Sequence, residues 1–146
     1  MTIMIIDGNS LAYAAQCATP LTVDGMEVQG VFHSLKTLRT LLYNYPRYAN
    51  KIFWLWDHRA QWRYDLYPEY KGKRQDTLEK VSVKVSLESA KPMLETMLTS
   101  LGVDQVFATG YEADDVAAML SRAATAKQRE ALLVTGDRGS SWSIAT

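Results

Sequence analysis

Four short strand-like segments, three of them apolar, alternate along this 146-residue chain with longer segments that have helical periodicity. The strand-like segments are Ile3–Ile6, Ile52–Trp56, Val103–Ala108 and Ala131–Thr135. Apolar runs of about four to eight residues without polar alternation are typical of strands that are buried on both faces. Strands that alternate with helices form a parallel sheet with helices packed on both faces. The sequence therefore predicts an α/β fold with three layers and a mainly parallel central sheet.

The helix predictions rest on apolar residues at intervals of three and four positions. The expected helices are Ser10–Cys17, capped by Asn9 or Ser10, then Gly30–Tyr45, a segment that spans Leu87–Leu101 and ends at Gly102, and Glu112–Ala124. Pro92 either begins the third helix or kinks it. A small hairpin is expected around Asp24-Gly25, because this dipeptide favours a tight turn. No repeating pattern is visible in residues 138–146, so we expect one domain over 1–137 followed by a divergent tail.

Acidic residues follow the predicted strands. Asp7, Asp57 and Asp137 come directly after three of them, and Glu112, Asp114 and Asp115 follow the fourth after a short turn. In sheets of this kind, ligands bind outside the carboxyl ends of the strands. We therefore expect these carboxylates to converge on one edge of the sheet. Each could separately be an ordinary turn or cap residue, but the whole set is a poor choice for structure alone.

Several ionised carboxylates at one edge raise one another's pKa unless a counter-charge is present. Mg²⁺ or Mn²⁺ would supply that charge, because these ions prefer carboxylate oxygen and keep water in their other positions. A pair of such ions roughly 3.5–4 Å apart can activate water and stabilise the leaving oxygen of a phosphodiester. The acidic residues thus predict metal-dependent phosphodiester chemistry.

A basic and aromatic stretch lies between the second strand and the third helix. It contains Trp62, Tyr64 and Tyr67 together with the residues predicted to contact DNA, which are Arg59, Arg63, Tyr70, Lys71, Lys73 and Arg74. Cationic side chains bind phosphates, and aromatic faces stack on exposed bases regardless of sequence. Beside an acidic metal edge, this stretch predicts contact with a nucleic acid.

The composition adds few constraints on the partners or the location of the protein. Lys+Arg and Asp+Glu are balanced at 16 each, and no apolar run is long enough for a membrane helix. The single Cys17 cannot form an internal disulfide, which fits a cytoplasmic location, and no signal peptide is visible. Cys17, Trp54, Trp56 and the methionines at 93, 97 and 119 are expected in the core. The histidines are expected to be structural: His33 on its helix, and His58 in a loop, where contact with a phosphate is the alternative.

Five segments in a fixed order resemble motifs of the flap endonuclease / 5′–3′ exonuclease family, whose nuclease domain is PIN-like. They are Asp7-Gly8, Trp56-Asp57, Tyr67-Pro68-Glu69-Tyr70-Lys71-Gly72-Lys73-Arg74, Gly110-Tyr111-Glu112-Ala113-Asp114-Asp115 and Thr135-Gly136-Asp137. The chain is most similar to the bacteriophage and bacterial members. The resemblance implies a metal-dependent enzyme of DNA replication and repair that cuts DNA at 5′ ends or flaps. It implies metal roles for Asp7, Asp57, Glu112, Asp114, Asp115 and Asp137, and catalytic phosphate contacts for Lys71 and Arg74.

The chain also departs from the family pattern. Ala14 stands where the family usually has an arginine, and Gly139 where it usually has a further metal-binding aspartate. The helical half that follows in the family is not seen, so we expect that a second polypeptide could be needed to supply it. The alternatives are a catalytically impaired DNA-binding or accessory subunit and a PIN-type ribonuclease.

Overall fold

The computed structural model describes residues 2–57, 78–107, 111, 113–136 and 142–145. Its first half contains β1 (Thr2–Asp7), α1 (Gly8–Gln16), β2 (Thr22–Val23), β3 (Met26–Glu27), α2 (Gln29–Asn44), the 3₁₀ helix η1 (Pro46–Tyr48) and β4 (Ile52–Trp56). Its second half contains α4 (Leu78–Ser100), β5 (Asp104–Phe107), α5 (Ala113–Ala126), β6 (Glu130–Gly136) and β7 (Trp142–Ala145). Within these residues, no helix is both long and apolar enough to cross a membrane.

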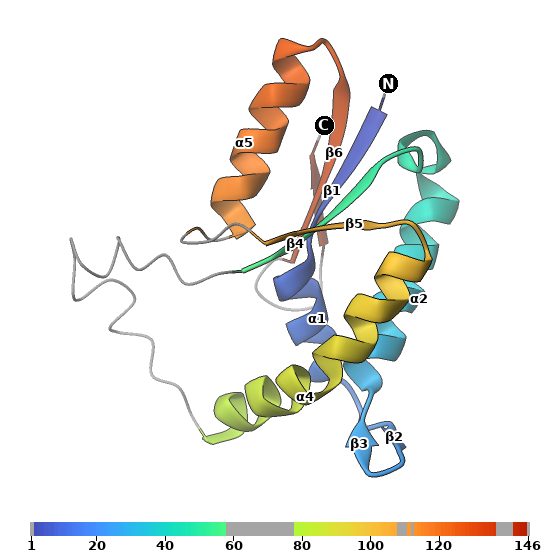
Figure 1. Ribbon diagram of the computed structural model, residues 1–146, viewed down its shortest axis with the longest axis vertical. Coiled ribbons are helices and arrows are strands. Elements are labelled where there is room, and N and C mark those ends of the chain that lie inside the picture. The colour runs from blue at the N-terminus through green and yellow to red at the C-terminus, as the bar shows by residue number, and fades with distance from the viewer. Residues whose placement is uncertain (1, 58–77, 108–110, 112, 137–141, 146) are drawn as a thin grey trace, which may run out of the picture.

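Five strands form one sheet in the order β5-β4-β1-β6-β7 (Figure 1). Strand β1 pairs in parallel with β4 and β6, and β4 pairs in parallel with β5. Strand β7 is antiparallel to β6 at one edge. The expected α/β fold with a mainly parallel central sheet is therefore confirmed.

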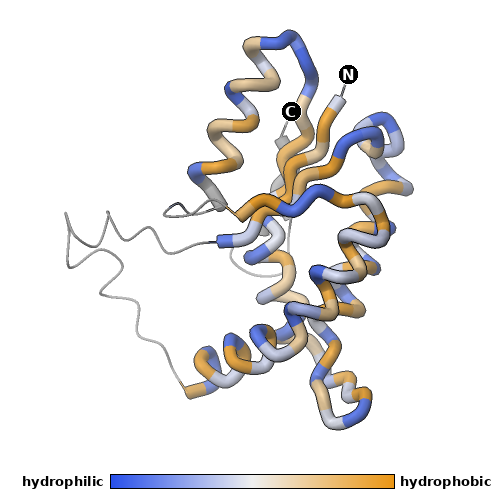
Figure 2. The backbone as a smooth tube through the Cα atoms, viewed as in Figure 1, coloured by the Kyte–Doolittle hydropathy of each residue, from blue (hydrophilic) through white to orange (hydrophobic). Residues whose placement is uncertain are grey.

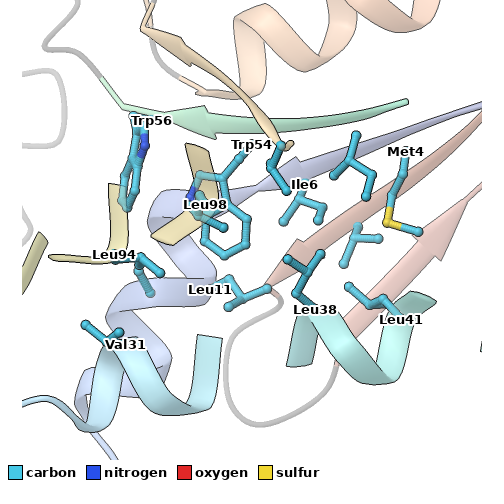
Figure 3. Packing of buried hydrophobic residues seen from close by; sticks show 14 of the residues in the cluster. Met4, Ile6, Leu11, Val31, Leu38, Leu41, Trp54, Trp56, Leu94 and Leu98 are labelled. Carbon is cyan, nitrogen blue, oxygen red and sulfur yellow. The ribbon is translucent and has the colours of Figure 1, made fainter. Parts of the chain in front are cut away.

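Side chains alternate between the two faces of the sheet, and each face has its own apolar cluster. Met4 and Ile6 of β1 belong to the cluster that packs against α1, α2 and α4, whereas Ile3 and Ile5 belong to the cluster that contains α5 residues. Figure 3 shows the first cluster, with Trp54 and Trp56 from β4 facing the helices. The central strands β1, β4 and β6 appear as largely hydrophobic segments in Figure 2. Both faces of the central strands are covered, which is why their sequences are apolar throughout.

The chain changes direction across the sheet after β5. It runs outward from β1 to β4 and β5, and then α5 carries it back to β6 on the other side of β1. Because crossovers between parallel strands are right-handed, this reversal places α5 on the face opposite α1, α2 and α4 (Figure 1). Ligands of such sheets bind where the strand order reverses, outside the carboxyl ends. Here that point is the end of β1, where Asp7 lies.

The first helix begins earlier than its sequence predicts. Asp7 is the N-cap of α1, and the helix starts at Gly8 rather than at Ser10. Neither Asn9 nor Ser10 is the cap, so that expectation was wrong. A glycine directly after a strand reads as a turn, whereas here the strand passes into the helix without a loop.

Helix α4 is longer than the sequence predicts. Its first turns do not pack in the core, so no apolar periodicity marks them in the sequence. Its buried stripe is Leu87, Ala90, Leu94 and Leu98, while Leu78 and Val85 in the earlier turns are exposed. Pro92 lies inside the helix and does not begin it.

The methionines expected in the core are on the surface. Met93 and Met97 lie one position away from the buried stripe of α4 and are 37% and 39% exposed. Met119 on α5 is 59% exposed, beside the buried Val116 and Ala117. Cys17, at the C-cap of α1, is also exposed. These four predictions were wrong, because apolar side chains next to a buried stripe can stay in solvent at little cost.

The hairpin and the tryptophans agree with the sequence. Strands β2 and β3 meet at Asp24 and Gly25, which have φ of 51° and 79°, as a tight two-residue turn requires. Trp54 and Trp56 are 0% and 1% exposed. In the segment where the sequence shows no repeating pattern, residues 142–145 form β7. A strand of four residues is too short for a period to be visible, and its pairing with β6 determines it.

Candidate functional site

Asp7 lies at the carboxyl end of the central strand and is 7% exposed. Its Oδ1 accepts a hydrogen bond from the backbone N–H of Ser10 at 3.3 Å, and its Oδ2 accepts one from the Ser10 hydroxyl at 2.9 Å. A cap of this kind fixes the carboxylate at the N-terminus of α1, beside the positive end of the helix dipole. Asp7 thus has a structural role in addition to the metal role that the sequence predicts.

Asp57 lies at the same edge, on the neighbouring strand end. Strands β1 and β4 are in parallel register with Asp7 opposite Leu55, so Asp57 follows two residues later. The side-chain amide of Asn9, on the first turn of α1, donates a hydrogen bond to Asp57 Oδ2 at 3.1 Å. The helix capped by Asp7 therefore also orients Asp57, and the two carboxylates belong to one connected unit.

Close packing beneath Asp7 holds this unit in place. A Cβ on Gly8 would lie 1.9 Å from Trp54 Nε1, so the backbone at the start of α1 rests directly on the buried indole ring. Sequence reasoning missed this contact and the role of Asn9. The spacing of Asn9 two residues after Asp7 was the available signal, but it was read as a helix cap.

The opening turn of α5 carries the next pair of predicted ligands. Asp114 and Asp115 are its second and third residues, and Asp115 is half-buried. Helix α5 packs against β1, β4 and β6, so its N-terminus approaches the carboxyl edge of those strands. The structure describes the backbone at Asp114 but not its side chain. Glu112 and Asp137 lie outside the described residues, as does Gly139.

Whether this edge suits a divalent metal ion depends on the atoms that could coordinate it. Asp7, Asp57 and Asp115 offer only carboxylate oxygens, which suit a hard ion such as Mg²⁺ or Mn²⁺ and not a soft one. Within the part of the chain that the structure describes, no three His, Cys, Asp or Glu side chains are grouped closely enough to form a metal site. The predicted site therefore depends on residues beyond those described, and the ligand set stays a prediction.

The predicted DNA-contacting residues all lie within 58–77, outside the described residues. They are Arg59, Arg63, Tyr70, Lys71, Lys73 and Arg74, and His58 lies there too. His33 is half-buried on α2, with its ring 5.1 Å from that of Phe32 in an edge-to-face arrangement. This contact fits the expected structural role of His33.

An open cavity of about 500 Å³ lies away from the carboxylates. Its lining includes Arg47, Tyr48, Arg129 and Glu130. Glu130 pairs with Thr2 at the amino end of β1, so the cavity is on the opposite edge of the sheet. Arg47 forms an ion pair with Glu130 at 2.6 Å, which offsets charge there. The cavity is therefore separate from the acidic edge.

Residues 2–142 match the family described as 5′-3′ exonuclease, N-terminal resolvase-like domain. The chain is 32% identical to DNA polymerase I of Mycobacterium tuberculosis over 94% of its own length and 15% of that protein. It is 31% identical to flap endonuclease Xni of Shewanella baltica over 93% of its length and 48% of that protein. The chain thus spans about half or less of the length of these curated relatives.

Solved structures with the same fold include the 5′-exonuclease of bacteriophage T5 with bound zinc ions, at 22% identity and a TM-score of 0.68. A complex of the T5 flap endonuclease with DNA and metal ions matches with a TM-score of 0.65 at 22% identity. In both cases the match covers 94% of this chain and 49% of the other. These similarities establish the fold.

Proposed function

Because this chain belongs to the 5′-3′ exonuclease N-terminal resolvase-like domain family, we propose that it is the nuclease domain of a metal-dependent enzyme that hydrolyses DNA phosphodiesters at 5′ ends or flaps. The observation that carries the proposal is the unit formed by Asp7, Asn9 and Asp57. It holds two carboxylates at adjacent ends of parallel strands, where the strand order reverses. The family match and the relatives named as a flap endonuclease and as DNA polymerase I support a nucleic-acid substrate.

In this proposal, the metal ligands are Asp7, Asp57, Glu112, Asp114, Asp115 and Asp137. Bound Mg²⁺ or Mn²⁺ would supply an activated water and stabilise the leaving oxygen. The cap hydrogen bonds hold the Asp7 carboxylate in one orientation, while Asn9 orients Asp57. The protein's own contribution is thus a fixed set of anionic oxygens, prepared before any ion binds.

The basic segment would bind the substrate. Lys71 and Arg74 would offset charge on the scissile phosphate, and Arg59, Arg63 and Lys73 would bind neighbouring phosphates, with Tyr70 stacking on a base. About half of the flap endonuclease relative and most of the DNA polymerase I relative lie outside the match, so further phosphate contacts would come from the part that follows in such proteins. We propose that full activity requires it, either in the same polypeptide or in a second one.

A catalytically impaired DNA-binding subunit is the second candidate, because Gly139 stands where the family usually has a metal-binding aspartate. A missing carboxylate would weaken the second ion, and a two-ion mechanism needs both. A cleavage assay separates the two candidates.

The assay uses a labelled 5′-flap DNA and the chain with Mg²⁺ or Mn²⁺, with EDTA as the metal-free reference. The chain alone is expected to cleave weakly or not at all near the flap junction, and a polypeptide that carries the remaining half should restore cleavage. Asp57→Asn should lower the restored activity by at least 100-fold, a size typical of removing a charge-stabilising catalytic group. Asp104→Asn is the matched control, because Asp104 is at the amino end of β5 and pairs with Lys51. Binding without metal-dependent cleavage, even when the remaining half is added, would support the impaired subunit, and cleavage of RNA in preference to DNA would support a PIN-type ribonuclease.

A further inference from the structure

An exposed aromatic ring lies next to the acidic edge. Phe107 is the last residue of β5, in register with Trp56, so it lies one strand away from the end that carries Asp57. Its side chain is 52% exposed. A single exposed apolar residue needs no explanation in itself, so what matters is where this ring lies and what supports it.

Trp56 fixes the orientation of this ring. The two rings are stacked, with centroids 6.4 Å apart and an angle of 17° between their planes. Trp56 is 1% exposed, and its Nε1–H donates a hydrogen bond to Gln105 Oε1 at 2.8 Å. Gln105 is held in turn, because its amide donates to the backbone carbonyl of Glu95 and to Thr99 Oγ1, both at 2.9 Å. Phe107 is therefore supported from behind by a rigid group, which lowers the entropy cost of binding to its exposed side.

Lys91 adds a positive charge to the same surface. Its Nζ lies 4.7 Å from the ring centroid of Trp56 and 5.9 Å from that of Phe107. Among the residues that the structure describes, Lys91 forms no ion pair with a carboxylate, so the aromatic faces hold its ammonium group in place. The cluster of Trp56, Phe107 and Lys91 thus combines an exposed aromatic ring with a cation.

We propose that Phe107 stacks on an unpaired nucleobase of the substrate and that Lys91 binds the phosphate next to that base. Aromatic rings and cations together are the usual means of binding single-stranded nucleic acid without sequence preference. This inference rests on the proposed function and adds to it, because it names a contact on described residues of α4 and β5, apart from the basic segment 58–77. The cluster would position the single-stranded part of a flap beside the carboxylates.

The test measures binding of a fluorescent single-stranded DNA by anisotropy, in Ca²⁺ or without metal so that no cleavage is needed. Phe107→Ala should weaken binding by roughly 5- to 150-fold, the range for loss of one stacked base. Phe107→Trp, which keeps an aromatic ring at this position, should bind as tightly as the wild type. Lys91→Gln should weaken binding and lower the slope of log affinity against log salt by about one phosphate contact. Tyr43→Ala is the control, because Tyr43 is an exposed aromatic residue (85%) near the C-terminus of α2.

A second measurement locates the contact directly. DNA that contains 5-iodouracil is irradiated with the wild-type chain, and the crosslinked peptide is identified by mass spectrometry. Attachment at Phe107 supports the proposal. Unchanged affinity in Phe107→Ala, while the wild type binds DNA, overturns it and leaves the proposed function intact. Unchanged DNA affinity with altered light scattering would instead assign Phe107 to a protein interface. No DNA binding by the wild type, even with the remaining half added, would overturn both proposals.

Discussion

Replacing Gly8 by alanine tests how the acidic edge is built. The new Cβ would lie 1.9, 2.2 and 2.4 Å from Nε1, Cδ1 and Cε2 of Trp54. Ordinary contacts begin near 3.4 Å, so the backbone and the ring must move apart by about 1.5 Å. The indole is rigid and 0% exposed, which leaves it no free direction in which to move.

The magnitude follows from two opposing effects. Overpacking a core costs typically 1–3 kcal/mol, and the rigid enclosed ring favours the upper end of about 3 kcal/mol. Alanine gains at most about 1 kcal/mol over glycine from helix propensity at the start of α1. We expect a net loss of about 2–3 kcal/mol, which lowers Tm by roughly 5–10 °C for a domain of this size.

Urea and thermal unfolding, followed by circular dichroism, measure this loss. Trp54→Phe provides the decisive background, because phenylalanine lacks the five-membered ring that the new Cβ would contact. In that background, Gly8→Ala should be nearly neutral, which gives a coupling free energy of about 2 kcal/mol in the double-mutant cycle. An equal cost of Gly8→Ala in both backgrounds, or a Tm equal to that of the wild type, would refute the packing argument.

Three further perturbations test other parts of the molecule. Gln16→Met should destabilise the fold by about 2 kcal/mol in urea unfolding, because it removes the hydrogen bond to the buried N–H of Gly30 (3.0 Å) and leaves that donor unpaired. Mg²⁺ or Mn²⁺ should raise Tm relative to EDTA, because an ion at 100 times its Kd adds about 2.7 kcal/mol to the free energy of unfolding. Asp57→Asn should abolish this increase in Tm, and an increase that persists in the variant would place the ion elsewhere. Lys71→Ala combined with Arg74→Ala should reduce the salt dependence of DNA binding by about two phosphate contacts, and an unchanged slope would remove these residues from the interface.

Much of the fold follows from local sequence signals. The runs Ile52–Trp56 and Ala131–Thr135 are apolar because both faces of the strands are covered, and a run of this kind has few alternatives. The Asp24-Gly25 turn was equally clear, since few other dipeptides accept two positive φ angles. The position of the acidic residues after the strands also predicted the edge at which Asp7 and Asp57 lie together.

The tertiary structure decided what local signals could not express. The sequence does not show that Asp7 caps α1, that Asn9 joins it to Asp57, or that Gly8 rests on Trp54, because each contact joins groups that only the fold brings together. Likewise, Met93 and Leu94 are adjacent and both apolar, yet only Leu94 is buried, because the rotation of α4 against the sheet selects one stripe. Periodicity is a property of the chain, whereas burial depends on which other elements pack against a segment. The sequence therefore determined most of the elements, while packing determined β7 and how the carboxylates are held.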